Sequence, residues 1–155
     1  MRPGVRLGID VGSVRIGIAA SDPTGLLARP VETVPRGAGD LDRIAALALD
    51  LEVVEVLVGL PVSLSGREGP AAESVRAFAS EIGLRLRPLG VRLVDERNTT
   101  VDAHRALAAA GIRAKDRRAV IDQAAAVIMV QTALDAERMT GRPPGTTLQL
   151  DDGDA

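Results

Sequence analysis

The segment Val53–Leu60, VVEVLVGL, constrains the fold more than any other part of the sequence. It is an almost continuous apolar run that stops at Pro61 and has the length of a β-strand. Side chains of a strand point alternately to the two faces of a sheet, so apolar residues at nearly every position are typical of a strand covered on both faces. We therefore expect a central, buried strand in a sheet that is covered by helices.

Four further segments have the character of strands. Residues 5–10 and 16–21 are apolar and are joined by a short stretch in which Gly12 suits a tight reversal, which predicts a β-hairpin. Residues 30–34 form a third extended segment, and residues 91–95 form the last one. Because three strands come in succession before strands and helices alternate, we expect an α/β fold with a five-stranded mixed sheet. The expected strand order is 3-2-1-4-5, with the second strand antiparallel.

Local signals place four helices around this sheet. Asp40 is expected to cap the first helix, and Pro70 to begin the second. Thr99 starts a pattern that resembles a capping box, and the helix that it begins is expected to stop at Gly111. The last and longest helix is predicted from about residue 116 to residue 139.

The chain has room for one compact domain. It contains 155 residues, of which 46% are hydrophobic, and a chain of this size buries roughly two thirds of its unfolded surface. We expect residues 1–140 to form that domain. Residues 141–155 contain two prolines and an acidic end, which predicts a disordered tail.

The composition excludes several classes of function. There is no cysteine, so disulfides and thiolate metal sites are ruled out, and a cytoplasmic location is favoured. No apolar run approaches the length of a membrane span of about 18 residues. Phe78 is the only aromatic residue, so base stacking on aromatic rings cannot be the main way of holding nucleic acid. Any nucleic acid would have to be recognised by its shape and backbone.

Three carboxylates are candidates for a metal site. Asp10 ends the first predicted strand and Glu96 follows the last one, and the carboxyl ends of strands gather at one edge of an open α/β sheet. Asp122 lies on the last helix and shares a face with apolar residues, where a carboxylate requires a partner. Simpler explanations remain open. Asp10 could be a turn residue, Glu96 could pair with a surface arginine, and Asp122 could pair with Arg118.

Four sequence motifs together resemble one known family. They are GIDVGSVRIGIAASD at 8–22, VGLPVSLSGREG at 58–69, VDERNTT at 94–100 and IDQAAAVIMVQTALD at 121–135. In this order they resemble the YqgF/RuvX family of bacterial ribonuclease H-like proteins, which are described as pre-16S rRNA nucleases or Holliday-junction resolvase homologues. The resemblance implies a ribonuclease H-like fold and a catalytic, metal-binding triad of Asp10, Glu96 and Asp122. It also implies a cofactor, Mg²⁺ or Mn²⁺, and phosphodiester hydrolysis.

Four other residues are candidates for binding the substrate. Gly59 would leave room for a phosphate between the acids, or it would merely begin the turn before Pro61. Arg97 beside Glu96 could hold a phosphate through its guanidinium group. Thr99 and Lys115 lie at helix starts, where they could contact a nucleic-acid backbone or serve only as a cap and a solvated surface charge.

Several functions are compatible with these residues. The preferred one is a nuclease that acts on structured nucleic acid, either pre-16S rRNA during ribosome biogenesis or a four-way DNA junction. Such a protein would act as a monomer or a homodimer. Ribosomal particles are candidate partners. The glycine-bearing hairpin also resembles the phosphate-binding hairpin of actin-like ATP-binding phosphotransferases, although the chain supplies only one of their two halves. A third possibility is a non-catalytic module that binds ribosomes or the transcription machinery.

Overall fold

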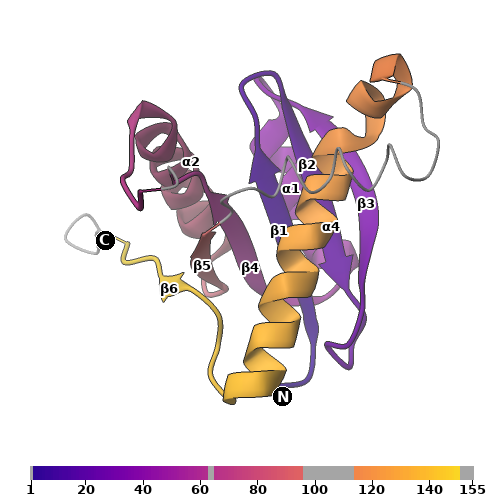
Figure 1. The fold of residues 1–155 in the computed structure, drawn as a ribbon, viewed down its shortest axis with the longest axis vertical. Helices are drawn as coiled ribbons and strands as arrows, with labels where there is room; N and C mark the ends of the chain where they lie inside the picture. The colour runs from indigo at the N-terminus through magenta and orange to yellow at the C-terminus, as the bar shows by residue number, and fades with distance from the viewer. Residues whose placement is uncertain (1, 63–64, 96–113, 151–155) are drawn as a thin grey trace.

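A central sheet with helices on both faces forms the architecture (Figure 1). The computed structural model describes residues 2–62, 65–95 and 114–150. Helices α1 (Asp40–Asp50) and α2 (Pro70–Leu86) cover one face, and the long helix α4 (Ala114–Thr140) crosses the other. The predicted α/β class is confirmed. None of the helices in the described ranges is long and apolar enough to cross a membrane.

Within the described residues, the sheet has six strands in the order β3-β2-β1-β4-β5-β6. Their bounds are β1 (Val5–Val11), β2 (Arg15–Ser21), β3 (Ala28–Pro35), β4 (Val53–Leu60), β5 (Gly90–Asp95) and β6 (Thr146–Thr147). Strand β1 pairs antiparallel with β2 and parallel with β4, and β4 pairs parallel with β5. The predicted order and the antiparallel second strand are confirmed, but the predicted count of five strands is one too small.

The extra strand corrects the prediction that residues 141–155 are a disordered tail. Thr146 and Thr147 pair antiparallel with β5, and the amide of Leu148 donates a hydrogen bond to the carbonyl of Val91. Leu150 lies against Gly83 of α2. Proline and acid content indicated disorder, but two leucines that cover the edge of the core hold this segment in place. Residues 151–155 lie outside the described residues.

One prediction about a helix start is also corrected. The residue that caps α1 is Gly39, with φ of 89°, and Asp40 is the first helical residue. The Asp40 carboxylate accepts hydrogen bonds from the amides of Gly37 and Leu41. An aspartate one residue inside the helix still satisfies local amides and suits the positive end of the helix dipole, so the sequence signal was displaced by one position.

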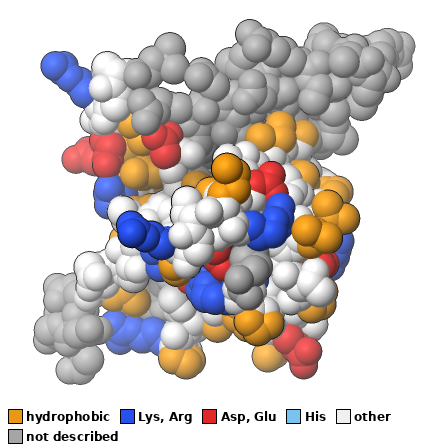
Figure 2. All heavy atoms as spheres, turned by 60° about the horizontal axis from the view of Figure 1, so that its bottom comes forward, with side chains coloured by type: hydrophobic (Ala, Val, Ile, Leu, Met, Phe, Trp, Pro, Cys, Tyr) orange, Lys and Arg blue, Asp and Glu red, His pale blue; other side chains and the backbone are white. Residues whose placement is uncertain are grey.

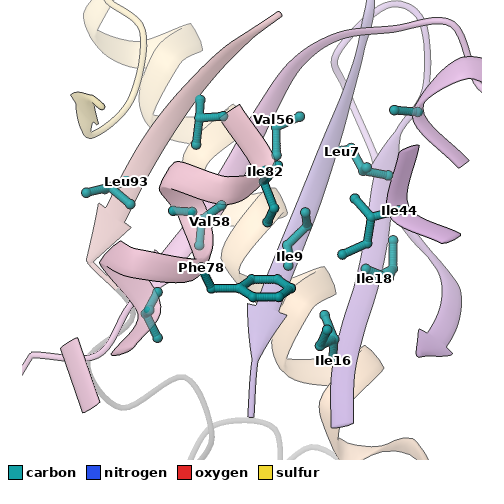
Figure 3. Close-up of a cluster of buried hydrophobic side chains, with 14 of the residues drawn as sticks. Leu7, Ile9, Ile16, Ile18, Ile44, Val56, Val58, Phe78, Ile82 and Leu93 are labelled. Atoms are coloured by element: carbon teal, nitrogen blue, oxygen red, sulfur yellow. The ribbon is translucent and has the colours of Figure 1, made fainter. Parts of the chain in front are cut away.

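The larger part of the core lies between the sheet and α1 with α2. Figure 3 shows it as an aliphatic cluster into which Phe78 of α2 inserts beside Ile9 and Ile16. Val56 and Val58 of β4 belong to this cluster, whereas Leu57 belongs to the second cluster, beneath α4. Strand β4 is therefore covered on both faces, as its unbroken apolar sequence predicts.

A buried network of charges fixes the far end of α4. Glu137 is only 3% exposed and accepts hydrogen bonds from Arg2 and from Arg6, which is 1% exposed. Arg2 also bridges to Glu55 of β4 with an N–O distance of 2.8 Å. Because these groups lie where β1 and β4 begin, α4 ends there and runs antiparallel to β1.

Around that end of the molecule, where the chain starts and α4 finishes, basic and acidic side chains are interspersed with apolar ones (Figure 2). The described side chains in this view form no field of one sign. A polyanion would gain little from such a mixed surface.

Candidate active site at the carboxyl edge of the sheet

Asp10 lies next to the last residue of β1, on the face of the sheet that α4 covers. Leu7 and Ile9 belong to the core beneath α1 and α2, so Gly8 and Asp10 face the other side. Gly8 demonstrates this directly, since a Cβ atom there would lie 2.0 Å from Cγ2 of Val130 in α4. Asp10 therefore lies near the end of β1, at the carboxyl edge of the sheet and on the face that α4 covers.

Gly59 occupies the neighbouring position on β4. The pair Ile9–Val58 is in register, so Asp10 and Gly59 follow it side by side on the two parallel strands. Gly59 pairs onward with Val94 of β5, and it precedes Leu60, the last residue of the strand. It therefore belongs to the strand and does not begin the turn, which leaves a position without a side chain beside Asp10.

The spacing of the candidate acids follows from this order of strands. Strand β4 separates β1 from β5, so the backbones that carry Asp10 and the end of β5 are about 10 Å apart. Glu96 is the residue after Asp95, where β5 ends. Glu96 itself lies outside the described residues, as do Arg97 and Thr99.

Position 122 belongs to the backbone of α4, the helix whose later residues pack against the sheet. Ala126, Met129 and Ala133 of this helix are buried in the second cluster, and Asp122 precedes Ala126 by four residues, about one turn. Because α4 runs antiparallel to β1, moving from Val130 toward position 122 leads from Gly8 toward Asp10. The fold brings this helix position and Asp10 to the same end of the α4 face.

Two other candidates, Asp122 and Lys115, lie on α4. Their backbone is described, but their side chains lie outside what the structure describes. Within the described residues there is no cluster of three carboxylates or histidines suited to a metal. Of the three predicted acids, only Asp10 has a described side chain.

Sequence reasoning missed one basic residue at this edge. Arg36 follows β3, and its Nη1 donates a hydrogen bond of 2.9 Å to the carbonyl of Gly12 in the turn between β1 and β2. Its guanidinium lies over the ring of Phe78, 4.8 Å from the centroid. The available signal was topological: β3 runs antiparallel to β2, so the residue after β3 returns to the turn that follows Asp10.

A mixed sheet with an antiparallel second strand and helices on both faces is the arrangement of the ribonuclease H-like fold that the resemblance implies. A solved structure of T. thermophilus RuvC in complex with Holliday junction substrate has the same fold. It matches with a TM-score of 0.59 over 91% of this chain and 99% of that chain, at 18% identity.

The family model described as RuvX, Holliday junction resolvase, matches residues 4–136. The chain belongs to this family, which confirms the resemblance seen in the motifs. The family is one of nucleases, which are hydrolases of phosphodiester bonds.

Curated relatives match the chain over nearly its whole length. A protein of Thermobifida fusca is 57% identical, covering 96% of this chain and 98% of its own. A protein of Nocardioides sp. is also 57% identical, covering 96% and 99%, and one of Mycobacterium leprae is 60% identical, covering 85% and 73%. All three carry the name "Putative pre-16S rRNA nuclease".

Proposed function

We propose that this protein is a metal-dependent nuclease that processes the 5′ end of pre-16S rRNA in the cytoplasm. The observation that supports the proposal is that Asp10 and Gly59 lie side by side at the carboxyl ends of two parallel strands, on the face of the sheet that α4, the helix carrying Asp122, covers. Relatives at 57% to 60% identity bear the name of that activity. The proposed catalytic and metal-binding residues are Asp10, Glu96 and Asp122.

The available donors fit a hard divalent cation. Carboxylate oxygens are preferred by Mg²⁺ and Mn²⁺, whereas softer metals favour thiolates, which a chain without cysteine lacks. The single histidine, His104, lies outside the described residues. When bound, such ions would supply an activated water and neutralise charge on the scissile phosphate.

Each element of the chain has a separate task in this scheme. Strand β1 holds Asp10 rigidly because its neighbours on both sides are paired strands. Gly59, which pairs with Val94 of β5, would leave space beside that carboxylate for a phosphate oxygen. Arg97, Thr99 and Lys115 would contact the nucleic-acid backbone next to the acids, which is the role we propose for them.

The decisive experiment compares wild type with Asp10→Asn. RNA that carries the 5′ precursor extension of 16S rRNA is incubated with Mg²⁺ or Mn²⁺, and the products are mapped by sequencing gel. We expect Asp10→Asn to lower the cleavage rate by at least about a thousandfold, because charge stabilisation at the reacting phosphate is lost. Asp42→Asn on α1 is the matched control and should cleave like wild type, since α1 packs on the face of the sheet opposite to Asp10 and Asp42 pairs with Arg85.

Two outcomes would contradict this proposal. Equal cleavage by wild type and Asp10→Asn would remove Asp10 from the site, and absence of cleavage by wild type with either metal would remove the nuclease activity on this RNA. Circular dichroism and urea unfolding of each variant establish that it is folded. Glu96→Gln and Asp122→Asn extend the same test to the other two acids.

A four-way DNA junction is the second candidate substrate. The favouring observation is the family description as Holliday junction resolvase. Matched RNA and junction substrates at equal concentration separate the two, and a measured mass in solution adds a criterion, because symmetric cleavage of a junction needs two active sites whereas trimming of an RNA end needs one. Faster cleavage of the junction by a dimer would replace the rRNA proposal.

A further inference from the structure

A small pocket lies beside Asp10 but on the opposite face of the sheet edge. It has a volume of about 210 Å³ and lies between the β1–β2 turn, Pro61 and the first turns of α2. Its polar side chains are those of Ser13, Arg36 and Ser74. The volume exceeds the roughly 30 Å³ of a water molecule and falls below the roughly 300 Å³ at which sites for larger organic ligands begin. The pocket therefore suits a compact group.

The polar side chains of the pocket select for an anion. Arg36 only donates hydrogen bonds, and the hydroxyl groups of Ser13 and Ser74 can donate. None of the described residues that line the pocket is acidic. Gly69 caps α2 without a side-chain hydrogen bond to the helix amides, so the start of α2 adds partial positive charge at the same place.

Arg36 is held in position before any ligand arrives. Its Nη1 donates to the carbonyl of Gly12, and its guanidinium lies over Phe78. Phe78 is the only aromatic ring of the chain and is 5% exposed, fixed in the core beside Ile9 and Ile16 as Figure 3 shows. Among the described residues, Nε and Nη2 of Arg36 have no hydrogen-bond acceptor. The guanidinium of Arg36 is thus held by two contacts, and its two remaining donor groups, Nε and Nη2, form a fork that fits a phosphate.

The position of the pocket beside Asp10 favours a phosphate of a nucleic-acid strand as the bound anion. Gly12 is two residues beyond Asp10, about 7 Å along an extended chain, so the two sites flank the same strand end. Val11, between them, packs on the α1 and α2 side, whereas Asp10 faces α4. A nucleic-acid strand with its scissile phosphate at Asp10 would place a neighbouring phosphate in the pocket when it crosses the edge of the sheet.

We propose that Arg36 binds a phosphodiester of the substrate strand next to the scissile one and so guides the strand over the carboxyl edge between β1 and α2. The inference rests on the proposed nuclease function and adds a substrate-binding residue and a path to it. Arg36 is a positioning residue, because it does not reach the proposed metal site.

The test measures affinity without turnover. Binding of fluorescent single-stranded and precursor RNA is followed by anisotropy with Ca²⁺ in place of Mg²⁺, and a gel verifies that the RNA is intact. Arg36→Gln can still donate to Gly12 but carries no charge. We expect it to weaken binding about tenfold and to lower the slope of log Kd against log salt by about one, as loss of one phosphate contact predicts. Arg36→Lys should keep most of the slope.

Arg85→Ala is the matched control. Arg85 lies in the last turn of α2, at the opposite end of this helix from the pocket, and pairs with Asp42 of α1. Its loss should therefore leave both affinity and salt slope unchanged. If Arg36→Gln binds like wild type with the same slope, Arg36 only anchors the turn, and the inference is overturned. That result would leave the Asp10 test untouched, whereas failure of Asp10→Asn to stop cleavage would remove the nuclease proposal without changing the measured contribution of Arg36.

Discussion

Gly8 determines how closely α4, the helix that carries the proposed site residue Asp122, approaches the sheet. A Cβ atom at this position would lie 2.0 Å from Cγ2 of Val130 and 3.2 Å from the terminal methyl of Met129. Val130 is fully buried, so it cannot turn away into solvent. Gly8→Ala must push the helix outward or force a strained rotamer. We expect it to lower the free energy of unfolding by about 2 kcal/mol and to reduce cleavage more than this loss of stability explains.

Two variants make the Gly8 prediction specific. Gly8→Ala combined with Val130→Ala should recover most of the activity, because the smaller side chain restores the space. Gly90→Ala in β5 is the control, since nothing lies within 4 Å of a Cβ atom there. Urea unfolding and cleavage rates are measured for all four proteins. If the double variant is no better than Gly8→Ala, the close approach is not what Gly8 provides.

At the level of secondary structure, the sequence predicted those elements whose patterns arise from burial. The unbroken apolar run of β4 and the hairpin at Gly12 were predicted correctly, and in the turn a Cβ atom on Gly12 would lie 2.7 Å from the carbonyl oxygen of Arg15. The β6 segment was missed because two residues in a strand have no detectable period, and its position depends on Leu148 and Leu150 covering a distant edge. Tertiary contacts therefore overrode local composition.

The buried network that anchors the C-terminal end of α4 makes the stability depend on pH. Burial raises the pKa of Glu137, but hydrogen bonds from Arg2 and the charges of Arg2 and Arg6 outweigh it, so the pKa falls below the usual 4.5. A lowered carboxyl pKa contributes stability that is present above the unfolded value and is lost as the pH falls through the folded value. We therefore expect the free energy of unfolding of wild type to decrease below about pH 4.5.

Glu137→Gln tests this assignment. Removing the carboxylate leaves Arg6 buried without its ionic partner, which should cost about 3 kcal/mol at pH 7. Because the variant lacks the titrating group, the difference between the two proteins should shrink as the pH falls from 5 to 3. Glu73→Gln, an exposed change in the first turn of α2, is the control. A constant difference across this range would show that Glu137 does not carry the pH dependence.

For the whole molecule, the sequence suggests candidate site residues but not the surface that they form. Asp10, Glu96 and Asp122 could be proposed because the sequence places each of them at the end of a predicted strand or on an apolar face of a predicted helix. Arg36 could not, because its value depends on β3 returning to the turn after Asp10 and on the single aromatic ring placed beneath it. The pairing of distant strands is long-range information that no local pattern contains.

The charge of the whole molecule leads to a final prediction about binding. The net charge of the chain is −2. Without the last five residues, the chain has 19 basic and 18 acidic residues, a net charge of +1. A nearly neutral protein cannot hold nucleic acid by its general field, and three carboxylates at the proposed site repel a phosphate unless cations lie between them.

We therefore expect affinity for precursor RNA to depend on the divalent ion. Anisotropy titrations at about 100 mM salt should give a Kd at least about tenfold weaker in EDTA than with Ca²⁺. The Asp42→Asn variant should show the same ratio as wild type, because Asp42 lies on α1, which packs on the face of the sheet opposite to Asp10, and it pairs with Arg85. Equal affinity in EDTA and Ca²⁺ would mean that a basic surface elsewhere, rather than the acidic edge with its cations, is where the nucleic acid binds.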